Sequence, residues 1–200
     1  MKKIILASAS PRRKELLEQI GIRFEVIESE TNENILLYNS PYEGVKILAY
    51  EKAKKVSDNI HEAAIIIGAD TMIAFKGKLL GKPGNHELAF NNLKELQGNK
   101  HTVYTGVCII VKEEDGTSSE YSLVDDTDVY MRKMEDEEIK TYLNAEEHCD
   151  KAGGYAIQGK GALIIEKIDG DYNNVVGLPL TAVYMLLKKI GVDITEYWDK

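Results

Sequence analysis

The sequence has little of what marks a membrane protein or a secreted protein. Its longest apolar stretches, such as Ala63–Ala69 and Val107–Val111, are far too short to cross a bilayer. The apolar run Ile4–Ala7 near the start ends at Ser8, so it is too short for the core of a signal peptide. We therefore expect a cytoplasmic protein that has no membrane partner.

Cysteine and histidine are also scarce. The two cysteines, Cys108 and Cys149, lie far apart, form no CxxC pair and have no histidine at ligand spacing. This argues against a structural disulfide and against a zinc site. Cys108 lies inside an apolar segment, where a buried packing role is the simpler interpretation.

Positive charge is in deficit, with 25 Lys and Arg against 33 Asp and Glu and a net charge of −8. That balance argues against a nucleic-acid-binding protein, which needs a broad basic face. It still allows a phosphate-bearing small substrate, because a few cations gathered in one cleft are enough. No repeat, low-complexity tract or Pro/Ser-rich linker divides the chain, so one domain over residues 1–200 is expected.

Short apolar segments alternate with segments of helical periodicity, which predicts an α/β or mixed α+β sheet fold. Ser40–Glu43 has the pattern of a capping box, and Leu88 is expected to face the core with the other apolar residues of its helix. The predicted strands cover residues 3–7, 24–27, 63–69, 72–75, 101–111, 121–132 and 163–168. The predicted helices cover residues 11–20, 41–57, 86–97, 136–145 and 179–191.

The first candidate site segment runs from Ser8 to Arg13. A strand ends here and a helix begins, so backbone N–H groups and the positive end of the helix dipole point into the loop. Ser8, Ser10, Arg12 and Arg13 add hydroxyl and guanidinium donors, and arginine binds phosphate oxygens in a bidentate manner. The two arginines are about 100° apart around the helix axis, so they cannot make the same contact. A capped helix with two solvated arginines would show the same local pattern.

The second segment is Asp70-Thr71, directly after an apolar run that predicts a central strand. Functional side chains of open α/β sheets lie at such strand ends. Asp70 could accept a proton from water or bind a divalent cation, although a turn aspartate is the plainer interpretation. Two lysines, Lys82 between glycine and proline and Lys52 on a predicted helix, are weaker candidates for phosphate ligands.

The third segment, residues 150–161, contains four glycines, which allow a backbone to approach a ligand closely. It has the spacing of neither a Walker A loop nor a dinucleotide-binding fingerprint. The Gln158 amide can donate and accept, which suits reading the edge of a nucleobase. A flexible turn with an incidental amide is the alternative.

Taken together and in order, these segments resemble the Maf family of nucleoside triphosphate pyrophosphatases, historically labelled septum-formation proteins. The resemblance runs nearly end to end. It is carried by SASPRRKELL at 8–17, EKA at 51–53, GADT at 68–71, LGKP at 80–83, HTVYTGV at 101–107, DKAGGYAIQG at 150–159 and NVVGLPL at 174–180.

The resemblance implies a twisted mixed sheet with flanking helices and a cleft between two lobes, similar to that of inosine triphosphate pyrophosphatases. It implies a hydrolase acting on acid anhydrides, in which water attacks the α-phosphorus and yields a nucleoside monophosphate and pyrophosphate. A divalent metal, Mg²⁺ or Mn²⁺, would be the cofactor, with Glu33 and Asp70 as its ligands and Asp70 also as general base. The implied triphosphate ligands are Ser8, Ser10, Arg13, Lys52 and Lys82.

The resemblance also points to the subtype that prefers dTTP and UTP, through Arg12, Thr71 and Gln158. A neutral glutamine can bond the O/N–H edge of uracil or thymine, whereas a carboxylate better suits a positively charged methylguanine. Two alternatives stay open: the same reaction on a methylated purine nucleotide, and a nucleotide-binding regulator of cell division. A homodimer is expected from the resemblance alone.

Overall fold

The computed structural model describes residues 2–29, 38, 40–145 and 151–198 of the chain. Its helices are α1 (Pro11–Gln19), α2 (Pro41–Asn59), α3 (His86–Leu96), α4 (Asp136–Leu143), α5 (Tyr172–Val176) and α6 (Leu180–Lys189). Its strands are β1 (Lys3–Ala7), β2 (Glu25–Val26), β3 (Ala64–Phe75), β4 (Lys78–Leu80), β5 (Lys100–Lys112), β6 (Ser118–Met131) and β7 (Ile165–Asp169). Short 3₁₀ turns η2 (Ala152–Gly154), η3 (Gly159–Leu163) and η4 (Ile194–Tyr197) complete the described elements.

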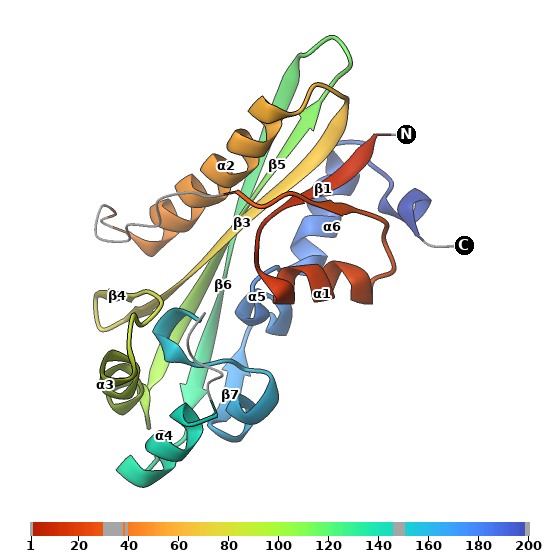
Figure 1. Cartoon of the computed structure of the whole chain (residues 1–200). Coiled ribbons are helices and arrows are strands. Elements are labelled where there is room, and N and C mark those ends of the chain that lie inside the picture. The colour runs from red at the N-terminus through yellow and green to blue at the C-terminus, as the bar shows by residue number, and fades with distance from the viewer. Residues whose placement is uncertain (1, 30–37, 39, 146–150, 199–200) are drawn as a thin grey trace.

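Within the described residues, seven strands form a sheet, which is mixed, as predicted. The predicted strands 63–69 and 72–75 are one strand, β3, and β4 was not predicted. The order of the sheet is β2-β1-β3-β5-β6-β7, with β4 paired to β3. Strand β1 is parallel to both of its neighbours, and the remaining pairs are antiparallel, including the long β5–β6 hairpin. Strands β3, β5 and β6 run the length of the molecule and connect its two lobes (Figure 1).

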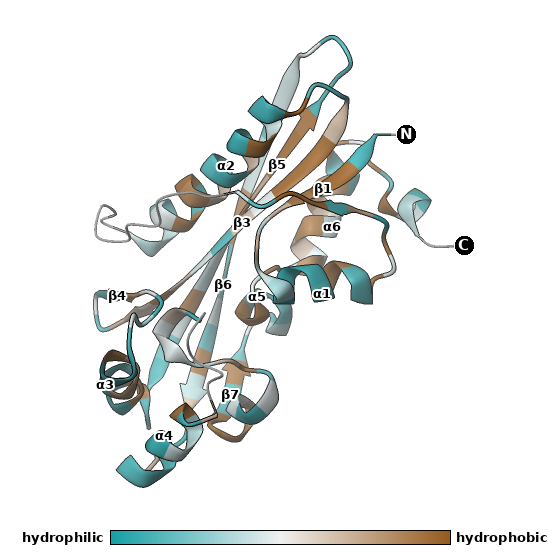
Figure 2. Cartoon of the chain, viewed as in Figure 1, coloured by the Kyte–Doolittle hydropathy of each residue, from teal (hydrophilic) through white to brown (hydrophobic). Residues whose placement is uncertain are grey.

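The two lobes have separate apolar cores along the same long strands. In the first lobe α2 covers one face of the sheet, while α1 and α6 cover the other. This explains the continuous apolar run in β3, because Ile65 and Ile67 face one core and Ile66 the opposite one. In the second lobe α3 and α4 pack on the far half of the same strands. Figure 2 shows the hydrophobic residues of β1, β3 and β5 between more hydrophilic outer helix surfaces.

Helix α2 packs against the sheet without intervening side chains at two glycines. A Cβ on Gly68 of β3 would come within 2.4 Å of the Ala49 carbonyl oxygen, and one on Gly106 of β5 within 2.3 Å of the Val45 carbonyl oxygen. Only glycine permits this approach. The consequence is that Lys52, on the buried side of α2, lies beside the middle of β3.

Two features bear directly on the expectations about membranes and cysteines. Among the described residues, no helix combines the length and the hydropathy needed to span a bilayer. Cys108 is fully buried in the core beneath α2, which confirms its packing role, and burial raises the pKa of its thiol to about 11.

Two local predictions are wrong. Leu88 is 47% exposed, because it lies about 100° around the α3 axis from Ala89, which is buried. The Ser40 side chain makes no capping hydrogen bond, and Pro41 begins α2 without one. A capping box is present instead at Glu135 and Glu138, at the start of α4.

The central strand and the C-terminal helix also differ from expectation. Strand β3 does not end before Asp70 but continues to Phe75. What ends there is its parallel partner β1, whose last paired residue, Ala7, lies opposite Gly68. The predicted helix at 179–191 is α6, and the short helix α5 before it was not predicted, since five residues are too few for a periodic pattern.

Gly68→Ala is expected to destabilise the protein by about 1–3 kcal/mol, because the new methyl group would press against the backbone of α2. The free energy of unfolding from urea titration measures this loss. Gly84→Ala is the matched control, since a Cβ there meets open space, and its effect should stay within about 0.5 kcal/mol. Equal effects of the two substitutions would contradict the close packing described here.

Candidate active site

A cavity of about 640 Å³ opens where β1 ends beside β3, a size typical of small-molecule sites. The structure places all the predicted site residues that it describes in the wall of this cavity. They are Ser8, Ser10, Arg12, Arg13, Lys52, Asp70, Thr71, Lys82 and Gln158. Glu33, the other predicted metal ligand, lies outside the described residues.

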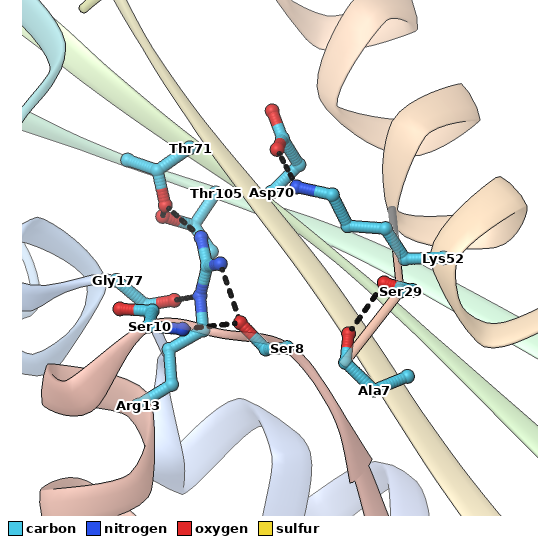
Figure 3. Close-up of polar contacts among 10 residues, drawn as sticks. All are labelled: Ala7, Ser8, Ser10, Arg13, Ser29, Lys52, Asp70, Thr71, Thr105 and Gly177. Carbon is cyan, nitrogen blue, oxygen red and sulfur yellow. Dashed lines mark hydrogen bonds and ion pairs between the residues drawn. The ribbon is translucent and has the colours of Figure 1, made fainter. Parts of the chain in front are cut away.

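The cavity contains a buried ion pair between Lys52 and Asp70. The lysine Nζ lies 2.6 Å from Oδ1 of the carboxylate, and both residues are at most 6% exposed. Lys52 comes from α2 and Asp70 from β3 (Figure 3). Asp70 lies just beyond the point where β1 stops pairing with β3. In the described part of the chain the other carboxylate oxygen, Oδ2, has no hydrogen-bond partner. The site therefore has a carboxylate with one oxygen bound to a cation and the other available to a ligand.

Arg13 is held on the opposite side of β3 from this pair (Figure 3). Its Nε donates to the carbonyl of Gly177 at 2.8 Å, and its two terminal nitrogens donate to Ser8 Oγ at 3.2 Å and to Thr71 Oγ1 at 3.0 Å. Arg13 is buried, whereas Arg12 is only partly buried at the cavity wall. The two arginines therefore differ in burial, as their separation around the helix axis leads one to expect.

The loop that begins α1 has the predicted form. Ser10 is the N-cap residue and Pro11 is the first helical residue. The Ser10 side chain makes no capping bond, and its backbone N–H donates to Ser8 Oγ at 3.2 Å. Both serines line the cavity.

The far wall is built by two loops of the second lobe. The backbone N–H of Gly153 donates to the carbonyl of Gly81 at 2.9 Å, which ties the Lys82 loop to the glycine-rich segment. Gly153 and Gly154 both have positive φ, a backbone conformation that favours glycine. Lys151 and Gln158, which lie before and after the paired glycines of that segment, line the cavity with Lys82.

The buried side chain of Tyr155 anchors this glycine-rich segment to the core of the second lobe. Its hydroxyl lies 2.5 Å from Nε2 of His101 on β5, and both side chains are buried. Burial raises the pKa of Tyr155 and lowers that of His101 to about 4, against a small opposing effect of Asp128. Both groups are therefore neutral near neutral pH.

Sequence reasoning missed several residues of the wall, notably Lys151, Tyr155 and the α5 residues Val175 and Val176. Lys151 and Tyr155 belong to the segment already singled out for its glycines, so their closeness to it was the available signal. Val175 and Val176 lie in the NVVGLPL string that carries part of the family resemblance, and this was their only signal, because a pair of valines is otherwise ordinary core composition.

A family model described as "Maf-like protein" matches residues 3–190. The chain belongs to the Maf family. Among its curated relatives in the family, a dTTP/UTP pyrophosphatase of Caldanaerobacter subterraneus subsp. tengcongensis is 48% identical, over 99% of this chain and 96% of the relative. Proteins of the same name from Thermoanaerobacter sp. (49% identity; 94% and 96% coverage) and Bacillus cereus (47%; 98% and 100%) are similar to the same extent.

Similarity to solved structures is looser. A HAM1 protein from Coxiella burnetii aligns over 67% of this chain and 75% of its own, with 12% identity and a TM-score of 0.41. The fold assignment of this Maf-family chain therefore rests on its own sheet topology.

The buried His101 makes stability depend on pH. Its folded pKa of about 4 lies below the usual 6.5, so the unfolded chain takes up the proton first as the pH falls. Stability from this residue is complete above pH 6.5 and is lost between 6.5 and 4, by about 3 kcal/mol at pH 4. Urea titrations across this range should show that His101→Gln, which can still bond Tyr155, lacks this component. An unchanged pH dependence in the variant would contradict the assignment.

Proposed function

We propose that this Maf-family chain is a nucleoside triphosphate pyrophosphatase that hydrolyses dTTP and UTP to the nucleoside monophosphate and pyrophosphate. The observation that carries the proposal is the composition of the cavity wall: among the described residues, Asp70 is its only acidic group, and five cationic side chains line the same wall. These cations are Arg12, Arg13, Lys52, Lys82 and Lys151. The names of the curated relatives support the same reaction and substrates.

The cations suit a triphosphate, because preorganised donors stabilise the charge that builds up on phosphoryl oxygens. Asp70 suits the role of general base, since its Oδ1 is held by Lys52 while Oδ2 is available to accept a proton. In the proposed step, water oxygen bonds to the α-phosphorus as its proton passes to Asp70. The bond from the α-phosphorus to the bridging oxygen breaks, and pyrophosphate leaves with that electron pair.

We assign recognition of the nucleobase to Gln158, in the second lobe. The Gln158 amide at the cavity wall can both donate and accept, as the edge of uracil or thymine requires. A site built to bond a polar edge rejects a base that leaves the amide unpaired. Apolar wall residues, among them Ile157 and Val176, supply a surface for the ring. Methylated pyrimidine triphosphates would meet the same groups.

A divalent metal fits this wall as part of a metal–triphosphate complex. No group of three potential ligands from His, Cys, Asp and Glu occurs among the described residues, so they do not form a metal cage. Mg²⁺ is commonly held by one or two carboxylates together with substrate phosphate oxygens. Asp70 is the described carboxylate that could serve, with Glu33 as the proposed second ligand. When bound, the metal would neutralise phosphate charge.

Pyrophosphate release from a panel of nucleoside triphosphates, with Mg²⁺ or Mn²⁺, tests the proposal. The wild type should turn over dTTP and UTP in preference to purine nucleotides, and Asp70→Asn should lower kcat by about 10²–10⁴-fold. Asp126→Asn makes the same chemical change on an exposed residue of β6 and should leave kcat unchanged.

Two outcomes would contradict the proposal in different ways. Preferred turnover of a methylated purine nucleotide would overturn the role given to Gln158. Nucleotide binding with no turnover of any substrate would favour the regulator of cell division instead.

A further inference from the structure

A buried hydrogen-bond chain runs behind Arg13, away from the cavity. Thr71 of β3 and Thr105 of β5 face each other in the sheet register, and their hydroxyl oxygens lie 3.0 Å apart. Thr105 is fully buried, and its hydroxyl donates to the backbone carbonyl of Asn174 at 2.9 Å. This series of hydrogen bonds therefore leads from the Arg13 guanidinium across β3 and β5 to helix α5.

The donor and acceptor of each hydrogen bond in this series follow from its last acceptor, the backbone carbonyl of Asn174. The carbonyl of Asn174 can only accept, so the single hydroxyl proton of Thr105 is directed to it. Thr71 must then donate to Thr105, which turns the Thr71 oxygen toward the N–H that Arg13 donates. Each bond fixes the orientation of the next, and such chains strengthen one another in a buried site.

Helix α5 holds Arg13 at a second point. The carbonyl of Gly177, directly after α5, accepts from Arg13 Nε at 2.8 Å. Arg13, Thr71, Thr105 and the segment from Asn174 to Gly177 thus form a closed ring of contacts (Figure 3 shows its Arg13, Thr71, Thr105 and Gly177 members). The Asn174 side chain, itself fully buried, secures α5 by donating to the Val103 carbonyl and to Thr127 Oγ1, both at 3.0 Å.

We propose that Thr105 is a positioning residue, which aims the Arg13 guanidinium into the cavity through Thr71. An arginine side chain has many rotamers, and fixing it before the substrate arrives avoids that ordering at the moment of reaction. The inference rests on the proposed function in one respect, namely that Arg13 binds phosphate. The Thr71 hydroxyl then positions Arg13 rather than contacting the nucleobase, since it already donates to Thr105 and accepts from Arg13.

The test compares Thr105→Val, which keeps the size of the side chain and removes the hydroxyl, with Thr105→Ser, which keeps the hydroxyl. Thr105→Val should lower kcat/KM for dTTP by about 10-fold or more, and Thr105→Ser should recover most of that loss. Thr102→Val is the matched control on the same strand, because its hydroxyl bonds Asp128 outside the ring. It should leave kcat/KM within about 2-fold of wild type.

A double-mutant cycle separates positioning from a general effect on the fold. In an Arg13→Ala background, Thr105→Val should cost less than about 2-fold in kcat/KM, because the residue through which it acts is gone. The same loss in both backgrounds would overturn the proposal, as would a Thr105→Val enzyme with kcat/KM within 2-fold of wild type. Should Thr105→Val not fold, Thr105→Cys, with its weak S–H donor, is judged by the same criteria.

A second measurement needs no substrate. Proton–nitrogen correlation NMR of the Arg13 side chain should show an Nη2–H, the group that donates to Thr71, protected from solvent exchange in the wild type and in Thr105→Ser, and faster exchange in Thr105→Val. Equal exchange in all three would overturn the positioning role. A wild type that hydrolyses no nucleotide but shows this pattern would refute the proposed function and leave the ring intact.

Discussion

The ion pair between Lys52 and Asp70 is the contact on which the rest of the site depends. A buried carboxylate without a partner costs several kcal/mol, so Asp70 can lie inside the cavity only because a lysine reaches it. The lysine reaches it because Gly68 and Gly106 let α2 lie against the bare backbone of the sheet. The close packing of α2 on the sheet thereby allows a carboxylate to lie in the cavity wall.

The cleft combines two kinds of wall because it lies between two separately packed cores on shared strands. The first lobe supplies the hydroxyls, the arginines and the ion pair, all held by β1, α1, α2 and β3. The second lobe supplies Lys82 and the glycine-rich segment, which Tyr155 and His101 fix from the core side. Most of the proposed phosphate-binding groups therefore lie on the first lobe, whereas Lys82 and the proposed nucleobase-reading Gln158 lie on the second, and strands β3 and β5 hold both lobes in one frame.

Local pattern in the sequence was enough for the order of the elements and for the loops that carry the site. Pro11 after Ser10 and the glycines around Lys82 and Gln158 mark those loops. It was not enough for Thr105, because a threonine in a strand has ordinary β-propensity, and only the register with Thr71 gives it a partner. The sequence also predicts that the strand ends at Asp70, because a charged residue after an apolar run is typical of a strand end. The strand continues because Lys52, 18 residues earlier on α2, pairs with the buried carboxylate, and local pattern does not reveal that contact.

In the proposed reaction, Asp70 directs water to the α-phosphorus of a triphosphate bound by the surrounding cations. The decisive measurement is hydrolysis of dTTP in water labelled with a heavy oxygen isotope, with the products separated and analysed by mass spectrometry. We expect the label in the nucleoside monophosphate and none in pyrophosphate. Label in pyrophosphate would mean attack at the β-phosphorus, and would contradict the placement of the triphosphate relative to Asp70.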